Sequence, residues 1–388
     1  MTAEVSQRNV PLTRPLMGAA EAEAVQRPIL SGWITQGPEV AGFEQEFASY
    51  TGAAHAVAVS NCTTALHLAL LSVGVQPGDE VITVSHSYIA TANSIRYCGA
   101  EPVFADIDAG TSNIDPTLIE PAISARTRAI LTVHQMGMPC DMAAILDVAR
   151  RHGLPVVEDA ACASGSSIRW EGEWQPIGRP LGDVACFSFH PRKVITTGDG
   201  GMLTTNNAQY AAQFRLLRQH GMSVNDRVRH SSNQVIFEEH SVLGYNYRMT
   251  DVQAAVGREQ LKRLPKIVVA RRRVAARYGE LLADVPGLTL PQEPEWARSN
   301  WQSYSVRLPE WCDQREVMQY LLDHGVASRR GIMCAHREAP YQRESAYDLP
   351  ESERAQDRSI ILPLYPQITD EDQAYVCEVL REACTRGS

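Results

Sequence analysis

Short apolar runs alternate with amphipathic stretches over the first two-thirds of the chain, and this alternation limits the fold more than any other feature. Amphipathic stretches such as residues 64–73, 116–123 and 142–152 separate the apolar runs. Strands that alternate with helices are joined by right-handed crossovers into a mostly parallel sheet with helices on both faces. We therefore expect an α/β fold. The expected strands are residues 55–60, 80–85, 102–106, 129–134, 155–159, 184–189 and 202–205.

The chain has 388 residues, more than one hydrophobic core usually supports, so we expect a large domain and a smaller one. A helical pattern at 251–264 is followed by a basic stretch at 266–277 that suits a helix joining the two domains. The remainder has its own patterns, with a strand at 303–308 and a helix at 315–324. The predicted organisation is a loose N-terminal arm (1–14), a large α/β domain (15–265) and a small C-terminal α+β domain (266–388).

Charge and cysteine usage narrow the class of protein. The net charge of −9 argues against nucleic-acid binding, which needs a basic face. The nine cysteines show no C-x-x-C pair and no Cys/His ligand spacing, which indicates reduced thiols and neither a disulfide framework nor a metal site. The chain shows no signal-peptide pattern and no apolar run of membrane-spanning length, so we expect a cytoplasmic protein without a membrane partner.

Lys193 lies in the segment FSFHPRKVITTGDGG, where an apolar run breaks into a glycine-rich turn. Ligands of a parallel sheet collect beyond the carboxyl ends of its strands, and Lys193 follows one such end. Burial lowers the pKa of a lysine and frees its amine as a nucleophile, which suits a Schiff base with an aldehyde. The alternative is a surface lysine at a strand exit.

Two acids, Glu158 and Asp159, end another buried run. Alternation along a strand puts them on opposite faces, so only one of them points into a site above the sheet. An acid at that place can pair with a protonated pyridine nitrogen, as expected for pyridoxal 5'-phosphate (PLP). The alternative is an acid that caps the following helix.

The segment SNCTTAL, residues 60–66, leaves a strand and opens an apolar helix. The exposed amides and the dipole of a helix start form an anion site, and Thr63 adds a hydroxyl donor. Ser188, five residues before Lys193, offers a second hydroxyl. Plain N-capping is the alternative for residues 60–66. The chain has neither a Walker loop nor a dinucleotide-binding glycine pattern after its first strand.

Tyr88 follows the expected strand at 80–85, where an aromatic ring can stack on a flat heterocycle. A tyrosine of the hydrophobic core is the alternative.

With these residues in place, the chain resembles the PLP-dependent sugar aminotransferases of the DegT/StrS group. The similar segments run in the family's order from about Arg14 to about Glu382, so they cover nearly the whole chain. Each segment is weak alone, but their ordered coincidence is specific. Besides the segments around Lys193, Asp159 and Cys62, they are SGWITQGPEVAGFEQEF, SHSYIATANSIRYCGAEPVFADID, LGYNYRMTDVQAA and LPLYPQITDEDQ.

The resemblance implies a fold type I PLP-dependent aminotransferase, with a mostly parallel seven-stranded sheet in the large domain. It implies that Lys193 forms the Schiff base with PLP, that Asp159 pairs with the pyridine nitrogen and that Tyr88 stacks on the ring. Cys62 and Thr63, mainly through backbone amides, and Ser188 would hold the phosphate. The active unit would be a homodimer in which Asn246 reaches the phosphate of the neighbouring subunit's cofactor, and a two-fold dimer is also the commonest assembly.

Four positions depart from the pattern of many family members. Cys162 stands where Gln is common beside the ring hydroxyl of the cofactor, and a thiol is a poor hydrogen-bond donor. Ser164 stands in place of His, Cys62 in place of Gly, and Asp199 in place of Glu. We therefore expect Cys162 to contact the cofactor, but its role in that contact stays open.

The reaction implied by the resemblance moves an amino group from glutamate or glutamine to a keto-sugar, foremost a nucleotide-linked 4-keto-6-deoxyhexose. Relatives that remove a sugar hydroxyl carry His in place of the lysine, so Lys193 favours amino transfer. A keto-cyclitol acceptor, as in aminoglycoside pathways, stays open. A noncatalytic PLP-binding regulator is the alternative from another class, but no added nucleic-acid-binding segment is visible.

Substrate contacts are expected in three places. Trp33, Thr35 and Gln36 in the N-terminal loop combine an aromatic ring with polar groups that suit a sugar. Arg330, next to Arg329, and His336 would face a diphosphate or the donor carboxylate, because arginine grips such groups with two hydrogen bonds. Arg248 is a further candidate for the donor carboxylate. A solvated basic turn is the alternative for the two neighbouring arginines.

Overall fold

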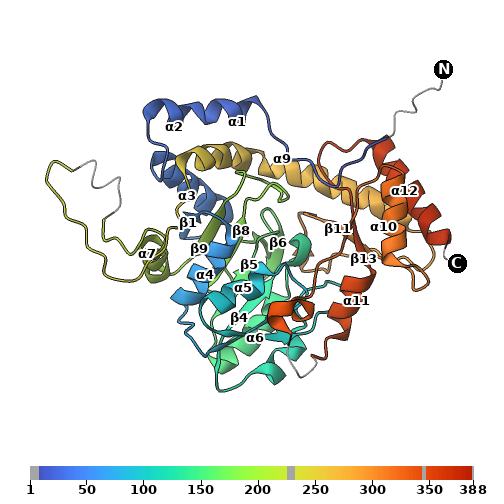
Figure 1. The fold of residues 1–388 in the computed structure, drawn as a ribbon, viewed down its shortest axis with the longest axis horizontal. Helices are drawn as coiled ribbons and strands as arrows, with labels where there is room; N and C mark the ends of the chain where they lie inside the picture. The colour runs from blue at the N-terminus through green and yellow to red at the C-terminus, as the bar shows by residue number, and fades with distance from the viewer. Residues whose placement is uncertain (1–7, 225–231, 343–346, 387–388) are drawn as a thin grey trace.

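The computed structural model describes residues 8–224, 232–342 and 347–386. These residues form a large part built on the central sheet and a smaller part that carries the C-terminus (Figure 1). The helix α9 (Asp251–Leu282), 32 residues long, runs from the large part into the small one. The first seven residues of the predicted arm lie outside the described residues.

The large part contains a seven-stranded sheet in the order β1-β9-β8-β5-β4-β2-β3. Only β9 runs antiparallel to its neighbours, and all the other adjacent pairs are parallel. The predicted α/β fold with a mostly parallel sheet is therefore confirmed. The strands are β1 (His55–Val59), β2 (Glu80–Val84), β3 (Glu101–Ala105), β4 (Thr127–Val133), β5 (Val156–Asp159), β8 (Val184–Ser188) and β9 (Gly201–Thr205).

Both faces of this sheet are buried, because successive strand residues point into different cores. Val81 packs beneath α4 (Cys62–Ser72), α5 (Ala90–Tyr97) and α7 (Ala208–Leu217), whereas Ile82 faces the opposite core. That second core takes side chains from α3 (Pro38–Thr51), α6 (Met142–His152) and the first half of α9. In a sheet of this kind, the loops that follow the carboxyl ends of the parallel strands can form a site.

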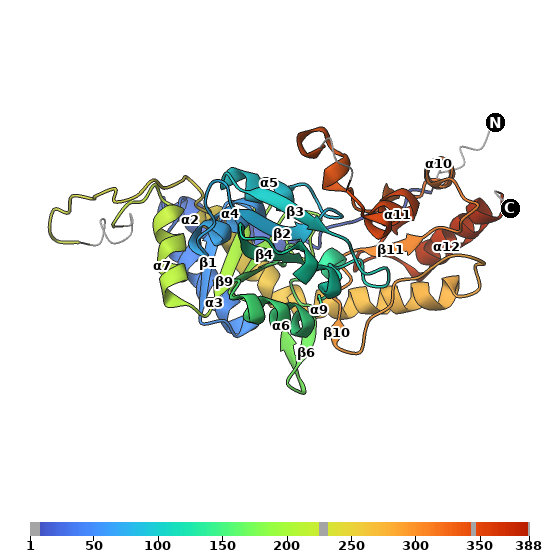
Figure 2. The same ribbon diagram turned by 90° about the horizontal axis from the view of Figure 1, so that it is seen from below.

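The small part is an antiparallel three-stranded sheet covered by helices (Figure 2). Its strands are β11 (Tyr304–Arg307), β13 (Ser359–Leu362) and β12 (Arg329–Arg330). Its helices are α10 (Gln314–Asp323), α11 (Pro350–Arg358) and α12 (Asp370–Thr385). A separate hydrophobic core forms around the buried Tyr278, Val306 and Leu380.

The helix α9 shows where the two cores meet. Leu264 and Ile267 pack into the large core, and Val274 packs into the small one. The helix continues across the expected boundary at 265/266 without a break, although Pro265 lies inside it. Val10 is fully buried in the small core and pairs with Val326, so the described part of the N-terminal arm packs against the small part.

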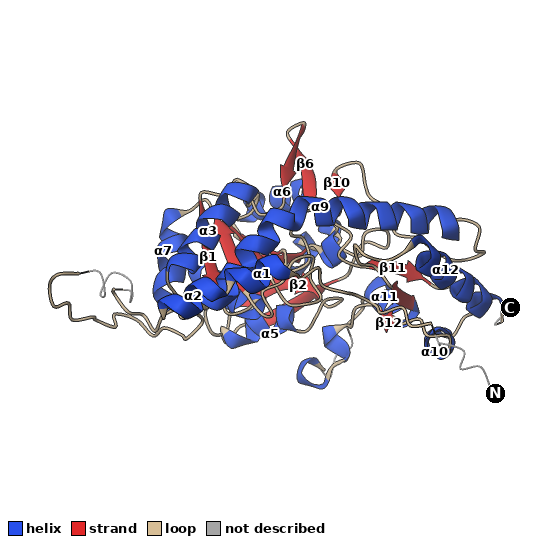
Figure 3. Cartoon of the chain, turned by 90° about the horizontal axis from the view of Figure 1, so that it is seen from above, coloured by secondary structure: helices blue, strands red, loops and turns tan. Residues whose placement is uncertain are grey.

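Two local features differ from the expectations. Residues 116–123 form two 3₁₀ turns, η1 (Pro116–Leu118) and η2 (Glu120–Ala122), because Pro116 and Pro121 each permit a new helix start but no longer helix. The hairpin β6 (Ser167–Trp170) and β7 (Glu173–Pro176), paired with β10 (Ala297–Arg298), was not expected and projects from the body (Figure 3). The remaining short helices are α1 (Ala19–Ala24), α2 (Gln26–Ser31), η3 (Gln135–Gly137), η4 (Ala335–Arg337) and η5 (Ala339–Tyr341).

The two parts are tied together by side chains. The Asp106 carboxylate, which follows β3, accepts hydrogen bonds from the backbone amides of Glu351 (2.9 Å) and Ser352 (2.8 Å) at the start of α11. An acidic side chain suits the positive end of a helix dipole. Across the described ranges, no helix is long and apolar enough to cross a membrane.

Candidate active site

A cavity of about 780 Å³ lies at the carboxyl ends of the central strands. It extends to β12 of the small part, so both parts contribute to its walls. A volume of this size suits a cofactor together with a small substrate. The predicted site residues that line it are Cys62, Thr63, Tyr88, Asp159, Cys162, Ser188, Lys193 and Arg330.

Lys193 is placed by the turn that follows β8. Its amide donates to His190 O (2.8 Å). The Phe189 amide donates to Gly200 O (2.8 Å), and Phe189 O accepts from the Thr197 amide (2.9 Å). The turn therefore folds back on the end of β8. The Lys193 side chain is directed into the cavity, where Nζ donates to Cys162 Sγ at 3.1 Å.

The structure corrects the expected protonation of Lys193. Burial lowers the pKa of its amine, but the Cys162 thiol, and then Cys62 and Asp159, raise it, and the net direction is upward. The sequence showed the desolvation but not that Cys162, Cys62 and Asp159 surround the amine. The cofactor-free site therefore holds an ammonium group.

Asp159 ends β5 and faces the cavity, as the alternation along the strand predicted. Its Oδ1 accepts from the Ala161 amide (3.1 Å), and its Oδ2 accepts from the Thr91 hydroxyl (2.9 Å). Burial raises the pKa of the Asp159 carboxyl, while the Ala161 amide, the Thr91 hydroxyl and Lys193 oppose that effect. A cation placed against this carboxylate would complete its neutralisation.

Glu158 makes different contacts from its neighbour Asp159. Its Oε1 accepts from the amides of Leu181 (3.0 Å) and Gly182 (2.9 Å), and its Oε2 lies 3.0 Å from His134 Nε2. The Cys140 amide donates to His134 Nδ1 (3.0 Å), so Nε2 carries the proton and donates to Glu158. This carboxylate is fully engaged in the fold and absent from the lining of the cavity.

The first residues of α4 line the cavity, and they offer backbone amides as well as side chains. Asn61 caps the helix by accepting from the Thr64 amide (2.9 Å), so the N-capping alternative is realised at Asn61. The amides of Cys62 and Thr63 belong to the first turn, which has no intrahelical acceptors for them. A Cβ at Gly201 would lie 2.4 Å from Asn61 O and 2.8 Å from Cys62 N, so this strand residue allows the helix start to approach β9.

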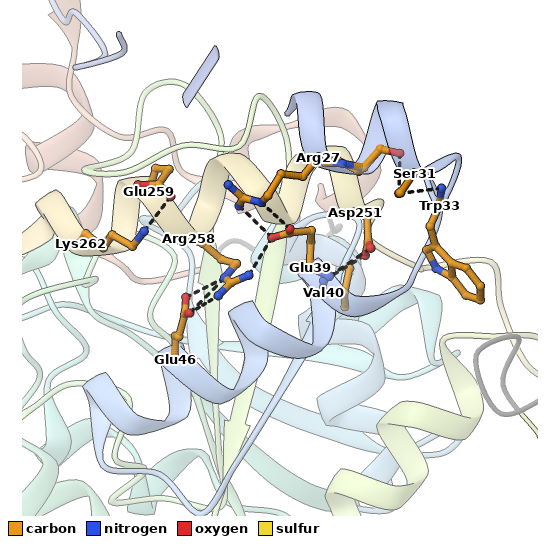
Figure 4. Close-up of polar contacts among 11 residues, drawn as sticks. Arg27, Ser31, Trp33, Glu39, Val40, Glu46, Asp251, Arg258, Glu259 and Lys262 are labelled. Atoms are coloured by element: carbon orange, nitrogen blue, oxygen red, sulfur yellow. Dashed lines mark hydrogen bonds and ion pairs between the residues drawn. The ribbon is translucent and has the colours of Figure 1, made fainter. Parts of the chain in front are cut away.

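Trp33, Thr35 and Gln36 lie outside the cavity of their own chain. Their loop precedes α3 and is fixed to α9, because the Asp251 carboxylate accepts from the amides of Gly37 (2.7 Å) and Val40 (3.0 Å) (Figure 4). Trp33 Nε1 donates to Gln36 O at 3.2 Å. The loop is thus held rigidly, although this chain alone does not bring it to Lys193.

Asn246 and Arg248 also lie outside this cavity. Asn246 is exposed and pairs through its backbone with Gln219, and Arg248 is half-buried shortly before α9. Their expected contacts stay predictions.

The structure gives His336 a different place from the one expected. Its side chain is buried between the two parts, where Nδ1 lies 2.6 Å from Ser85 Oγ and Nε2 lies 3.0 Å from Glu353 Oε1. Both ring nitrogens are therefore engaged by the protein, and His336 is absent from the lining of the cavity. The expectation that it binds substrate is corrected to an interdomain contact.

Two residues of the site were missed by the sequence interpretation. Thr91 donates a hydrogen bond to Asp159, and its signal was its position in the first turn of α5, shortly after Tyr88. Arg192 lines the cavity beside Lys193, together with Arg329 and Arg330 of β12. Nothing in the described part of the chain groups three or more metal-ligating side chains into a metal site.

Known proteins resemble this chain over almost its full length. The spore coat polysaccharide biosynthesis protein SpsC of Bacillus subtilis is 41% identical over 387 residues, covering 97% of this chain and 98% of that protein. GDP-perosamine synthase of Caulobacter vibrioides is 40% identical and covers 94% of this chain and 95% of its own. The crystal structure of S. venezuelae DesV has a TM-score of 0.89 with 35% identity, covering 98% of this chain and 100% of that chain.

The fold and the cavity therefore define an aminotransferase with the α/β architecture of these enzymes. The model of the DegT/DnrJ/EryC1/StrS aminotransferase family matches residues 15–381, and the chain belongs to this family. It is a PLP-dependent sugar aminotransferase. The residues present fit the cofactor, because one cavity combines an amine, a buried carboxylate and free helix-start amides.

Proposed function

We propose that this enzyme transfers an amino group from glutamate or glutamine to a nucleotide-linked keto-sugar, a 4-keto-6-deoxyhexose. The observation that carries the proposal is the cavity itself, whose lining combines Lys193 and Asp159 with three arginines. Two relatives support a nucleotide-linked acceptor by name, GDP-perosamine synthase and DesI, whose structure includes its TDP-sugar product.

The cofactor supplies an electron sink that stabilises negative charge at the carbon exchanging the amino group. In our proposal Lys193 would hold it covalently, Asp159 would pair with its protonated ring nitrogen, and Tyr88 would stack on its ring. The amides of Cys62 and Thr63 and the Ser188 hydroxyl hold its phosphate, which suits the positive end of α4. Cys162 borders the same ring.

Lys193 has a second role in this proposal. Once its amine is released, Nζ remains inside the cavity, where it could take the proton from the donor carbon and deliver it to the cofactor's former aldehyde carbon. The upward direction of the Lys193 pKa in the cofactor-free site means that this amine must lose its proton when the site is loaded. A cofactor cation paired with Asp159 would weaken the attraction of that carboxylate for the Lys193 ammonium group and so favour loss of its proton.

The three arginines support an anionic substrate group. Arg192 follows β8, and Arg329 and Arg330 come from β12, so the two parts of the molecule both contribute cations. Burial lowers the pKa of Arg329, and the neighbouring Arg192 and Arg330 lower it further. Among the described side chains, the ion pair that involves one of these arginines joins Arg330 to Glu338, with 3.9 Å between nitrogen and oxygen. A diphosphate would relieve their mutual repulsion through paired hydrogen bonds.

We also propose a homodimer in which Asn246 completes the neighbouring subunit's site. Asn246 is exposed and pairs with Gln219. The described residues between α7 and α9, 218–224 and 232–250, form an excursion that extends away from the body (Figure 2). This excursion carries apolar side chains that are almost fully exposed, Val235 (86%), Phe237 (87%) and Leu243 (84%). Apolar groups gathered on one segment favour burial against a second copy. The same dimer would bring Trp33, Thr35 and Gln36 of one chain toward the other chain's cavity.

A cytoplasmic location is part of the proposal. All nine cysteines are unpaired, and eight of them are buried, which suits a reducing compartment.

The test is turnover with a panel of acceptors, followed by mass spectrometry of the amine product. Nucleotide-linked 4-keto-6-deoxyhexoses, nucleotide-linked 3-keto-sugars and a keto-cyclitol are each supplied with glutamate and with glutamine. Amination of a 4-keto-6-deoxyhexose at the highest kcat/KM supports the proposal. Preference for the keto-cyclitol, or no amine from any sugar, refutes it.

A further inference from the structure

The thiol of Cys162 is paired with the amine of Lys193. Nζ lies 3.1 Å from Sγ, inside the cavity and beyond the ends of β5 and β8. The backbone around the thiol is fixed, because Asn300 Nδ2 donates to Cys162 O (2.7 Å) and to Ser164 O (2.8 Å). The sulfur is therefore held against a cation and cannot swing away with a loop.

Cys162 differs in its surroundings from the other eight cysteines. It is half-buried, whereas all the others are buried. Cys62 is the sharpest contrast, because it lines the same cavity but burial raises the pKa of its thiol far above the ordinary value, and Asp159 adds to that rise. Two thiols thus share one cavity, and Lys193 Nζ donates its hydrogen bond to the thiol of Cys162.

We infer that Cys162 is a modification site, a thiol activated by Lys193 that reacts with electrophiles and peroxides when the cofactor is absent. Reactive cysteines are found in electropositive, partly exposed surroundings, and both conditions hold here. The cavity admits small reagents to the sulfur. Only the expected effect of cofactor binding on Cys162 rests on the proposed function, in which Lys193 binds the cofactor.

The Cys162 sulfur is the nucleophile both in alkylation and in oxidation by peroxide. With an alkylating agent such as iodoacetamide, the thiolate sulfur forms a bond to carbon and iodide leaves. With hydrogen peroxide, the thiolate sulfur bonds to one oxygen and the O–O bond breaks, which gives sulfenic acid and hydroxide. The hydroxide takes up the proton that the thiol released and becomes water. Lys193 stays protonated in both reactions and stabilises the reacting anion.

Cofactor loading changes both conditions of this reactivity. A lysine that binds the cofactor covalently would no longer offer a free ammonium group to the sulfur, and a cofactor held by Lys193 and Asp159 would fill part of the cavity that Cys162 lines. The loaded enzyme should therefore protect Cys162. Conversely, an oxidised Cys162 would take up space beside Lys193 and hold its amine, and cofactor binding needs both. Peroxide treatment of the cofactor-free protein should therefore slow later binding of PLP.

The experiment measures modification, residue by residue, in the full-length protein. Cofactor-free and PLP-saturated samples are treated with iodoacetamide for a series of times, and peptide mapping follows each cysteine. We expect Cys162 in the cofactor-free protein to react at least about tenfold faster than Cys62, and PLP to slow it by a similar factor. Peroxide with a sulfenic-acid probe should label the same peptide and slow later PLP binding, read from the cofactor's absorbance.

Variants separate activation by Lys193 from mere exposure. Lys193→Arg keeps a cation and should keep most of the Cys162 reactivity, whereas Lys193→Ala should reduce it several-fold. In Cys162→Gln, peroxide should no longer slow PLP binding. Equal reactivity of Cys162 and Cys62, or of the Arg and Ala variants, overturns the inference, as does undiminished labelling with PLP. None of these readouts uses turnover, so they stand apart from the acceptor panel that tests the proposed function.

Discussion

The hydroxyl of Thr91 donates a hydrogen bond to Oδ2 of Asp159 across 2.9 Å, and both groups are buried. This contact links α5 to the end of β5 and fixes the direction of the carboxylate that faces the cavity. A second hydroxyl supports it, since Ser87 Oγ lies 2.7 Å from Thr91 Oγ1. The site carboxylate is therefore oriented before any cofactor binds.

Thr91→Val should weaken PLP binding without changing the fold. The isosteric change removes one hydrogen bond to a charged group, which is worth about 1.5–3 kcal/mol, or roughly 10- to 100-fold in Kd. Fluorescence or absorbance titration of the cofactor-free protein measures the change. Thr91→Ser keeps the hydroxyl and is the matched control. Equal Kd values for the Val and Ser variants would show that Asp159 needs no support from α5.

Lys193→Ala should abolish both turnover and the near-visible absorbance of covalently bound cofactor. The variant lacks the amine that forms the Schiff base and the group that moves the proton, so turnover should fall by about 10³-fold or more. Lys193→Arg has the charge but not the nucleophile and should fail equally. Borohydride reduction and peptide mapping of the wild-type protein should find the adduct on Lys193. An adduct on another side chain would remove the basis of the assignment.

The buried strands were predictable because their apolar runs are interrupted by turn residues at regular intervals. All seven predicted runs overlap a strand of the central sheet, and the alternation of Glu158 and Asp159 correctly predicted which acid lines the cavity. The prediction of a helix at residues 116–123 was wrong. It followed from the amphipathic pattern alone, but Pro121 lacks the amide hydrogen that a continuous helix needs there.

Side-chain partners were harder to predict than elements. His336 has the right chemistry for a substrate ligand, yet Ser85 and Glu353 engage both of its nitrogens, and no local pattern reports contacts 251 and 17 residues away. The pKa of Lys193 was misjudged for the same reason, since Cys162 is 31 residues distant in sequence. Long-range contacts decide protonation, and a single sequence does not display them.

The dimer proposal predicts complementation between an inactive variant and a variant with weakened cofactor binding, assayed at a PLP concentration too low to load the weakened one. Asn246→Ala should bind PLP about tenfold more weakly, as expected for a lost phosphate contact. Co-expressed with Lys193→Ala, it should restore about a quarter of wild-type activity, because half of random dimers would carry one intact site of two. Differently tagged subunits allow the mixed dimer to be purified and assayed. Activity no higher than the sum of the two separate variants would place Asn246 in its own chain's site.

The ion-pair cluster around Glu39 predicts a pH-dependent contribution to stability. Arg27 donates to Glu39 Oε1 at 2.9 Å, and Arg258 donates to Oε2 at 2.8 Å (Figure 4). The hydrogen bond from Arg27 lowers the pKa of the Glu39 carboxyl, burial opposes this, and Arg258 lowers it further. A lowered folded-state pKa stabilises the protein above the unfolded value of 4.5, and this contribution is lost as the pH falls through the folded value.

Glu39→Gln should therefore lower the free energy of unfolding by about 1 kcal/mol at neutral pH, discounted because Arg27 is half-exposed. The difference from wild type should shrink as the pH is taken well below 4.5. Urea unfolding at a series of pH values measures it, and the exposed Glu23→Gln is the control. A difference that is constant or grows toward acid would contradict the sign of this linkage.

Gly201→Ala should separate the start of α4 from β9. The added Cβ would lie 2.4 Å from Asn61 O and 2.8 Å from Cys62 N, and neither backbone atom can rotate aside. Relief requires the helix start to shift, so PLP should bind about tenfold more weakly and the free energy of unfolding should fall by about 1–3 kcal/mol. Phosphate-free pyridoxal tests the cause, because its affinity should change little if the displaced amides hold the phosphate.

The matched control is Gly279→Ala, since the Cβ added there meets no atom within 4 Å and lies in the long helix α9. Helix propensity predicts that this variant is stabilised by about 0.5–1 kcal/mol, with unchanged PLP affinity. The two glycine variants therefore move stability in opposite directions, and only Gly201→Ala should move cofactor affinity. Equal loss of pyridoxal and PLP affinity in Gly201→Ala would mean that the helix start acts through packing and that the phosphate lies elsewhere.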